Sequence, residues 1–511
     1  MNHNQLIKGT FFLVIAGFLS RFIGFFYRIY LSNILGPKNL GIYQLIFPIY
    51  SICYTIYASG IQTAISQTVA ANIDSKDKKH SLISPFLTGA SLSIFLSFTI
   101  SIILYKTAPF IAINLLKEPS CSSSLQILSL VFPYCGLTAC INGFYYAIKK
   151  TVIPSLSQLV EQIFRVGLVF TLFSLLKPQN SGCDIAVLGL VFGEFISCIF
   201  MLIALKFNKD FCSNFHIKQH TRFYSYRKFL LYTLPLSLNK LIISFLNSLE
   251  SILIPIMLVR SGLSHNVSLS IYGVLTGMAM SFIMFPSTIT NSLSVILLPT
   301  VSEANAKNNQ KVITQTVSNT LHYSIIIGLL SLFIFFIFGK DLGTTIFHNC
   351  SAGYFIQTLS FLCPFMYITT TFSSILNGLG KTTITFRNSI ISVVIKLLFI
   401  IFAIPYLGIK GYLIGILCSS VCVCILDLLS LKKYVDIKLN LFNTIIKPGI
   451  ILIISGFIIH NIYSYIIANS KLPNIYILIL SCILYVLTYT SIIFKEKISF
   501  ILHRNTYRVT K

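Results

Sequence analysis

Charged residues are scarce in this sequence, and acidic residues are the scarcest of them. Of 511 residues 10% are charged, with 13 Asp and Glu against 38 Lys and Arg, whereas soluble proteins carry about 25%. Hydrophobic residues make up 55%, and apolar runs of about 20 residues, long enough to cross a bilayer, recur along the chain. No segment is long and polar enough for a separate soluble domain. The composition predicts an all-α polytopic membrane protein.

The sequence also lacks a cysteine framework and a cleavable leader. Its 13 cysteines are scattered and form no CxxC pair, so neither a disulfide scaffold nor a metal centre is indicated, and no cofactor is expected. The first apolar run begins near Leu6, has no A-x-A cleavage site and contains two arginines. It is therefore predicted to be a retained first helix and not a signal peptide.

The net charge of +25 does not indicate a nucleic-acid partner once the charges are placed along the chain. Of the 38 basic residues, 25 lie in the N-terminus, alternate loops and the C-terminal tail, eight lie in the opposite loops, and five lie within apolar spans. This is the bias by which cytoplasmic loops carry Lys and Arg. It predicts cytoplasmic termini and a basic face turned toward anionic lipid.

Fourteen apolar spans are predicted, and one polar break divides the first twelve into two sets of six. The break, 207–227, is predicted to be a cytoplasmic linker between an N-terminal six-helix lobe at 1–206 and a C-terminal six-helix lobe at 228–432. Residues 433–511 are predicted to hold two extra helices and a basic cytoplasmic tail. The spans are 6–34, 40–71, 82–105, 122–148, 152–176, 184–206, 228–258, 268–301, 312–339, 353–379, 383–405, 409–431, 444–468 and 474–494.

The two sets of six spans resemble each other as a repeat. In one gap-free alignment, the repeat register, LQILSLVFPYCGLTA (125–139) and IQTLSFLCPFMYITT (356–370) share five identical positions, a proline included. The same register aligns Arg165 with Lys396. Because six spans separate equivalent helices, both halves enter the membrane in the same direction. Such repeats are related by an axis along the membrane normal, with the substrate site between them.

The first span carries two arginines where charges are costly. A charged side chain at the bilayer centre costs about 2.5–3.5 kcal/mol, yet Arg21 and Arg28 both lie in 6–34. Gly17, Arg21, Gly24 and Arg28 follow one another at four, three and four residues and share one helix face, with the arginines about 10 Å apart. Guanidinium groups bind phosphate bidentately and stay charged. This face predicts an anion site suited to phosphate.

Few acids are available to neutralise these arginines. Glu161 and Arg165 are spaced i, i+4 and are expected to pair with each other. Near the end of its span, Asp427 is expected to pair locally with Lys432. The four acids within spans are Glu161, Glu194, Glu250 and Asp427.

Glu250 is the acid that the repeat links to the first helix. Aligning Tyr43 with Tyr272 gives a second register, for the first two spans of each half, which places Arg21 opposite Glu250. Arg21 therefore either faces an open cavity or pairs with Glu250, and both alternatives stay open. Arg260 ends the same span as Glu250 on the predicted outer side. The predicted substrate-binding residues are Arg21, Arg28, Arg260 and Glu250.

Several segments resemble one known family. SRFIGFFYRIYLSNILGPKNLGIYQLIFPIYSICYTIYASGIQTAIS (20–66), INGFYYAIKKTVIPS (141–155) and LPTVSEA (298–304) are the parts that carry the resemblance. They are similar to the stage V sporulation protein B family, which consists of polysaccharide-export-type members of the multidrug/oligosaccharidyl-lipid/polysaccharide exporter superfamily related to the lipid II flippases. The similarity runs over nearly the whole chain. It departs at Gln67, where relatives usually carry lysine.

The resemblance implies two six-helix lobes in a V, followed by two further helices. In lipid II flippases the first-helix arginines face a central cavity and are needed for activity, which implies a substrate role for Arg21 and Arg28. Arg260 is a looser match. The last two spans would correspond to the pair that forms a groove for the lipid tail.

The residues and the resemblance together predict a flippase and not an enzyme. Its expected substrate is an undecaprenyl-diphosphate-linked, lipid II-like precursor, moved across the cytoplasmic membrane by alternating access for spore cortex peptidoglycan synthesis during sporulation. The residues expected to permit close approach and bending are Gly17, Gly24, Pro48 and Pro286. Expected partners are the lipid-linked diphosphate sugar, membrane lipids and cell-wall synthesis enzymes.

Other functions predict different sequence features. An exporter of another lipid-linked polysaccharide unit would have nearly the same sequence features as this chain. A multidrug or cation antiporter of the same fold should show a deep carboxylate in the N-terminal lobe without competing arginines. A membrane enzyme would need a sizeable extramembrane loop with acids or histidines. A non-transporting scaffold would tolerate loss of charge at Arg21.

Overall fold

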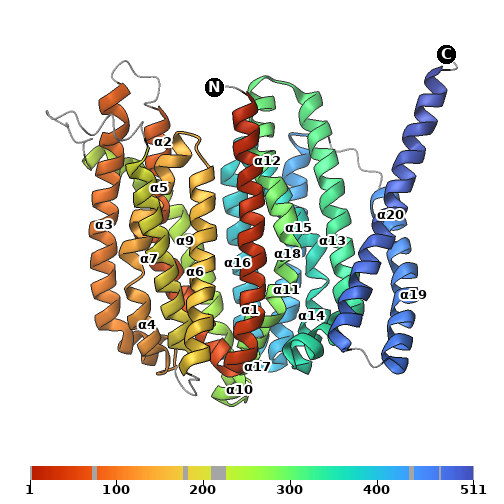
Figure 1. Cartoon of the computed structure of the whole chain (residues 1–511), viewed down its shortest axis with the longest axis horizontal. Helices are drawn as coiled ribbons and strands as arrows, with labels where there is room; N and C mark the ends of the chain where they lie inside the picture. The colour runs from red at the N-terminus through yellow and green to blue at the C-terminus, as the bar shows by residue number, and fades with distance from the viewer. Residues whose placement is uncertain are drawn as a thin grey trace. The chain divides into compact units, whose positions relative to one another are not determined.

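The computed structural model describes residues 3–71, 78–176, 182–208, 226–436, 442–470 and 473–509 (Figure 1). Every element in these ranges is a helix. Most of the predicted linker 207–227 lies outside the described residues. In chain order the helices are α1 His3–Tyr54, η1 Thr55–Ser59, α2 Gly60–Ala71, α3 Lys78–Phe110, η2 Ile111–Leu115, α4 Cys121–Ser129, α5 Phe132–Ala147, α6 Val152–Leu176, α7 Gly182–Lys206, α9 Tyr226–Arg260, α10 His265–Gly273, η3 Val274–Ala279, α11 Met280–Met284, α12 Ser287–Ala306, α13 Gln310–Phe347, α14 Cys350–Leu359, α15 Leu362–Gly378, α16 Thr382–Phe402, α17 Ile404–Leu407, α18 Ile409–Lys432, η4 Phe442–Ile446, α19 Lys447–Asn469 and α20 Asn474–Val509.

The helices group into two compact units. The first comprises 1–277 and 393–412, and the second comprises 278–392 and 413–511. The first unit therefore includes α9 and α10, because these helices pack against α1. The predicted lobe boundary at 207–227 does not coincide with this division by contact, and the six-plus-six arrangement stays a prediction.

The break between the first two predicted spans lies at Gly36 and Pro37. Gly36 has φ 70° and ψ 171°, a left-handed conformation that favours glycine. Pro37 has no amide hydrogen to donate, and it disfavours the helical conformation of the residue before it. The long α1 is thus two helices joined at a kink, as the predicted spans 6–34 and 40–71 require.

The number of spans agrees with the sequence prediction. By length and composition, eleven helices in the described residues can cross a membrane, or thirteen if each of two bent pairs is one span. One of the eleven, Ile15–Ala71, has 57 residues, which as a straight helix would measure about 85 Å, more than twice a hydrocarbon core of about 30 Å. Since it is kinked at Gly36, it supplies two spans. The predicted all-α polytopic fold of about fourteen helices is confirmed.

The internal repeat has the same local structure in both copies. The matched segments each form a bent pair of helices, α4–α5 at 46° and α14–α15 at 53°. At equivalent positions, the Ser129 hydroxyl donates to the Gln126 carbonyl at 2.6 Å and the Ser360 hydroxyl to the Gln357 carbonyl at 2.7 Å. Farther along, the repeat register aligns Lys149 with Gly380, and both have positive φ. These shared details support the register deduced from the sequence.

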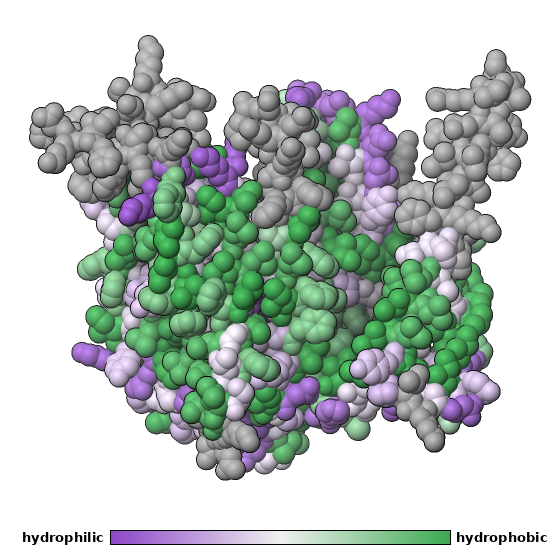
Figure 2. All heavy atoms as spheres, in the orientation of Figure 1, coloured by the Kyte–Doolittle hydropathy of each residue, from purple (hydrophilic) through white to green (hydrophobic). Residues whose placement is uncertain are grey.

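Each unit has its own hydrophobic core. In the first unit α2, α3, α5 and α9 bury side chains such as Ile65, Phe144 and Phe229. In the second unit α12, α13, α15 and α18 bury Val301, Leu321 and Leu376. Large apolar side chains also remain exposed, and Figure 2 shows that they cover most of the visible face. Exposed apolar side chains in such number indicate a membrane-facing surface on each unit.

The closest approach between α1 and α10 depends on two glycines. A Cβ on Gly41 would lie against the Leu269 carbonyl oxygen, and a Cβ on Gly273 against the Pro37 carbonyl oxygen. These glycines lie within or next to the LGIY and LSIY segments that the second register aligns. The two segments aligned by sequence therefore pack on each other.

Replacing Gly273 by alanine is expected to destabilise the protein by about 1–3 kcal/mol, because the added methyl group overpacks a backbone contact. The measurement is the midpoint of thermal unfolding of the purified protein in detergent. Gly167→Ala is the matched control, since a Cβ at Gly167 meets nothing within 4 Å. If Gly273→Ala unfolds at the same temperature as the wild type, the close approach of the two backbones is not as described.

Candidate functional site

The two arginines of the first span lie on α1 in the first unit. Both side chains are exposed. Arg28 lies close to Tyr43 and to Arg165 of α6. Gly24 stands between the two arginines, and a Cβ there would lie 3.5 Å from the Gln162 side-chain nitrogen. The face with Arg21 and Arg28 is thus bordered by α6.

Gln162 is a residue of this region that sequence reasoning missed. Its side-chain oxygen is buried and has no hydrogen-bond partner in the described part of the chain. Buried polar atoms are nearly always paired, so the unpaired oxygen of an amide group whose nitrogen lies next to Gly24 is a notable feature of this face. Its position directly after Glu161 was the available sequence signal.

Three of the four acids within the spans, Glu161, Glu250 and Asp427, contact groups other than Arg21. The Arg165 guanidinium donates to Glu161, so the predicted i, i+4 pair is confirmed. Asp427 accepts a hydrogen bond from Asn388 at 2.7 Å. No ion pair between Asp427 and Lys432 occurs in the described residues, so the expectation of a local pair was wrong. Arg21 likewise forms no ion pair with any described acid.

Glu250 has two partners that the sequence did not pair with it. The ammonium group of Lys396 on α16 lies 2.5 Å from one carboxylate oxygen, and the Tyr412 hydroxyl donates to the other at 3.1 Å. Glu250 is only 7% exposed. Lys396 thus neutralises the carboxylate. Of the two alternatives left open for Arg21, the pair with Glu250 does not occur in the described residues. A direct contact of Glu250 with substrate stays a prediction.

A sequence signal for Lys396 did exist. The repeat register aligns it with Arg165, and each of these two cations binds a carboxylate. Arg165 pairs with an acid on its own helix, whereas Lys396 pairs with Glu250 on α9, which is distant along the chain. Apolar periodicity carries no information about that long-range contact.

Other polar groups of α9 join it to the second predicted span, 40–71. The Lys240 ammonium group donates to the Ser59 carbonyl at 3.0 Å and to the Thr63 hydroxyl at 2.7 Å. The Ser248 hydroxyl donates to the Pro48 carbonyl at 2.9 Å. Pro48, predicted to permit bending, therefore lies in a polar contact between α1 and α9.

The remaining predicted residues have no contact with a charged group in the described part of the chain. Arg260 is exposed at the last position of α9, where its guanidinium lies 3.9 Å from the Met257 sulfur. A Cβ at Gly17 would meet nothing within 4 Å. Pro286, in the second unit, precedes α12 at the break that follows α11. Their predicted substrate-binding and conformational roles stay predictions.

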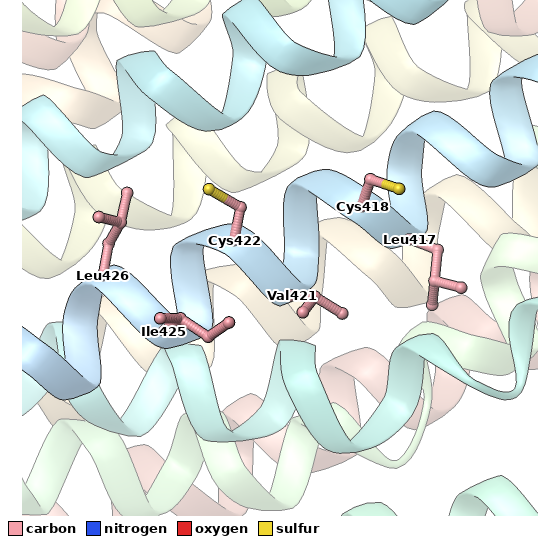
Figure 3. A pocket seen from close by; sticks show the side chains of 6 residues that line it. All are labelled: Leu417, Cys418, Val421, Cys422, Ile425 and Leu426. Carbon is pink, nitrogen blue, oxygen red and sulfur yellow. The ribbon is translucent and has the colours of Figure 1, made fainter.

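A pocket of about 410 Å³ lies along one face of α18 in the second unit. Figure 3 shows its side chains in a row along the helix, with two thiols among aliphatic groups. This face offers apolar contacts and no charge. The lining residues are Leu417, Cys418, Val421, Cys422, Ile425 and Leu426.

A separate contact joins two connecting segments of the first unit. Glu118, only 5% exposed, lies between η2 and α4, and its carboxylate is 2.9 Å from the His265 ring nitrogen at the start of α10. Burial alone would raise the pKa of Glu118. Hydrogen bonds from Ser120 and His265 outweigh it, so the pKa lies below the ordinary value of 4.5.

This pair predicts a loss of stability in acid. A carboxyl group whose pKa is lowered by folding stabilises the protein above its unfolded pKa, and this stabilisation is lost as the pH falls through the folded pKa. The stability advantage of the wild type over Glu118→Gln is therefore expected to be complete at pH 7 and to shrink below about pH 4.5. Unfolding midpoints of both proteins across this range test it, and a difference independent of pH would contradict it.

Comparison with known proteins supports the resemblance seen in the sequence. The profile of the family described as "Polysaccharide biosynthesis protein" matches residues 6–305, and the MatE profile matches residues 241–402. Stage V sporulation protein B of Bacillus subtilis is 25% identical over 91% of this chain and 91% of its own length. Lipid II flippase MurJ of the same organism is 25% identical over 77% of this chain and 76% of its own length.

Solved structures share the fold. A structure of lipid II flippase MurJ in an inward closed conformation superimposes with a TM-score of 0.69 at 16% identity, covering 95% of this chain and 99% of the other. An inward-facing multidrug resistance MATE family transporter of the MOP superfamily gives 0.65 at 15% identity, covering 81% and 96%. At these identities the likeness concerns the fold.

Proposed function

Because this chain belongs to the polysaccharide biosynthesis protein family, we propose that it is a flippase for an undecaprenyl-diphosphate-linked cell-wall precursor. The names of two relatives support a sporulation role and a lipid II-like substrate. On this proposal the protein acts in the cytoplasmic membrane with both termini in the cytoplasm, as the positions of the basic loops indicate. Its product would serve spore cortex peptidoglycan.

One observation carries the proposal: Arg21 and Arg28 are exposed on the same face of a membrane-spanning helix. An ionisable group within a span is costly and points to function. In the described residues Arg21 has no acid to neutralise it. A cation exposed within a candidate span is suited to an anionic ligand that arrives during transport.

The chemistry of a diphosphate fits this face. Each guanidinium presents a planar fork of donors that matches two phosphate oxygens. Arg21 and Arg28 are about two turns apart, about 10 Å along the axis, so they can hold neighbouring parts of a diphosphate-sugar head. Gln162 would contribute one further polar group. Arg260, at the end of α9, would receive the head later, near the outer side.

Transport then requires conformational change and no covalent step. The prenyl tail would stay in lipid along α19 and α20, while the head passes from one side to the other by alternating access. Gly17, Gly24, Pro48 and Pro286 would permit the bending involved. Further partners on this proposal are membrane lipids and cell-wall synthesis enzymes.

A multidrug antiporter of the same fold is the second candidate, since a MATE family transporter has the same architecture. Fold alone does not determine function. The exposed arginines oppose binding of a cationic drug, because like charges repel. Expression in a drug-sensitive host distinguishes the two, since the flippase should confer no resistance.

Lipid analysis of a deletion strain tests the proposed substrate. Loss of the protein during sporulation should cause a lipid-linked diphosphate precursor to accumulate on the cytoplasmic side. Unchanged precursor levels and sidedness in a strain without redundant flippases would contradict the proposal. Accumulation of a different lipid-linked polysaccharide unit would show that this unit, and not a cortex peptidoglycan precursor, is the substrate.

A further inference from the structure

The contact between Glu118 and His265 joins parts of the chain that the sequence assigns to different lobes. Glu118 lies between η2 and α4, in the predicted lobe 1–206, and His265 begins α10, in the predicted lobe 228–432. Oε2 of Glu118 and Nε2 of His265 are 2.9 Å apart. Because an ionised carboxylate only accepts hydrogen bonds, the imidazole donates. The contact thus links the two predicted lobes inside one compact unit.

The internal repeat separates the local role of Glu118 from this long-range contact. The repeat register aligns Lys117 with His348, and both have positive φ. It then aligns Glu118 with Asn349, whose amide oxygen accepts from a backbone amide in the first turn of α14 at 3.0 Å. Oε1 of Glu118 likewise accepts from a backbone amide two residues on, at 3.2 Å. Since asparagine suffices for that local role, the second oxygen of Glu118 is available to bind His265.

The helix α10 is held at both of its ends. Near its last residue, Gly273, it packs against the backbone of α1, and at its first residue, His265, it is bound by Glu118. The predicted loops 106–121 and 259–267 contain Glu118 and His265, and both loops are predicted on the side of the membrane opposite the termini. The contact therefore fastens α10 on that side of the membrane.

The exposure of the two side chains suits a contact that breaks and re-forms. The Glu118 side chain is 7% exposed, whereas the His265 side chain is 39% exposed. Water can therefore replace the imidazole when α10 moves away, while Glu118 keeps the hydrogen bond from the Ser120 amide. A pair buried on both sides would leave an unpaired charge in the interior on opening, which is strongly unfavourable.

We propose that Glu118 and His265 form a latch, which holds the segment between η2 and α4 against α10 in this conformation and opens when the two predicted lobes separate on that side. On the topology predicted from the basic loops this is the outer side. An open latch is then required for release of substrate to the exterior. That role in transport rests on the proposed function, whereas the opening itself does not.

Distances between spin labels test the latch without any substrate. Labels on ketone amino acids at Leu115 of η2 and Asn266 of α10, which are both exposed, leave the native cysteines in place. In lipid nanodiscs the labelled wild type should show mainly one short distance. Glu118→Asn keeps the local cap but loses the carboxylate, so a second population at longer distance should appear. Identical distance distributions in the two proteins would overturn the proposal.

Two further variants exclude a local distortion at Glu118 as the cause. His265→Ala removes the other partner and should produce the same longer population. Asn349→Ala is the matched control, because it removes the cap at the equivalent position of the repeat and should leave the distances unchanged. A longer population in Asn349→Ala, or none in His265→Ala, would show that the pair does not hold these segments together.

His265→Arg tests whether opening of the latch limits transport. Arginine binds a carboxylate through two parallel hydrogen bonds, so this variant should keep the latch closed and slow flipping about tenfold. Adding Glu118→Asn to it removes the partner and should restore at least the wild-type rate. Unchanged flipping by His265→Arg, or flipping that stays slow in the double variant, would overturn the role of the latch in transport.

The two measurements separate the latch from the proposed function. Absence of flipping by the wild type would contradict the proposed function, and the distances between the spin labels would still decide whether Glu118 and His265 hold the two segments together.

Discussion

Replacing Arg21 and Arg28 together by alanine is expected to reduce flipping of a lipid-linked diphosphate precursor about hundredfold. Hydrogen bonds to charged groups contribute about 1.5–3 kcal/mol each, and about 1.4 kcal/mol corresponds to a factor of ten. Each single replacement should therefore reduce flipping about tenfold. The measurement is the rate at which labelled precursor crosses the membrane of vesicles containing each purified variant.

Two controls separate a phosphate contact from a general effect of charge. The lysine variants keep the charge but lose the planar fork, so they should flip at rates between the wild type and the alanine variants. Arg227→Ala removes an exposed arginine from the first turn of α9 and should behave like the wild type. Wild-type flipping by the double alanine variant would show that these arginines do not hold the substrate.

Replacing Lys396 by alanine is expected to destabilise the protein by about 3–5 kcal/mol, because it leaves the Glu250 carboxylate buried and unpaired. Glu250→Ala should have an effect of the same size. The readout is the unfolding midpoint in detergent together with the yield of folded protein. Lys307→Ala is the matched control, since Lys307 and Glu303 form an exposed i, i+4 pair whose loss should cost less than about 1 kcal/mol.

The double replacement distinguishes a structural pair from a substrate contact. Glu250→Leu combined with Lys396→Met removes both charges, so stability should return to near the wild-type value. If flipping returns as well, Glu250 acts by holding α9 to α16. If the protein is stable but does not flip, the predicted contact of Glu250 with substrate gains support. Single variants as stable as the wild type would contradict the buried pair.

Local signals in the sequence were sufficient for several features. The break between the predicted spans 6–34 and 40–71 falls at Gly36 and Pro37, two residues that interrupt a helix in ways that need no tertiary contact. Glu161 and Arg165 were predictable as partners because i, i+4 neighbours meet on any helix. The repeat register aligned Pro133 with Pro364, and in the structure each of them lies in the first turn of the second helix of a bent pair.

Contacts between distant helices were not predictable in the same way. The pair of Glu250 with Lys396 depends on which face of α16 meets α9. The sequence of α16 is apolar nearly all round, so its pattern does not indicate which face packs on α9. Asp427 was expected to pair with Lys432 on its own helix, whereas Asn388 of α16 is closer in space. The tight glycine contact also falls at Gly41 and Gly273, not at the stripe of Gly17 and Gly24.

The most direct test is flipping by the purified wild-type protein in vesicles that hold a labelled undecaprenyl-diphosphate-linked precursor. Precursor placed in one leaflet should become accessible in the other much faster than in protein-free vesicles of the same lipids. The acceleration should disappear when Arg21 and Arg28 are both alanine. Translocation no faster than in protein-free vesicles, from protein shown to be folded after reconstitution, would contradict the central claim.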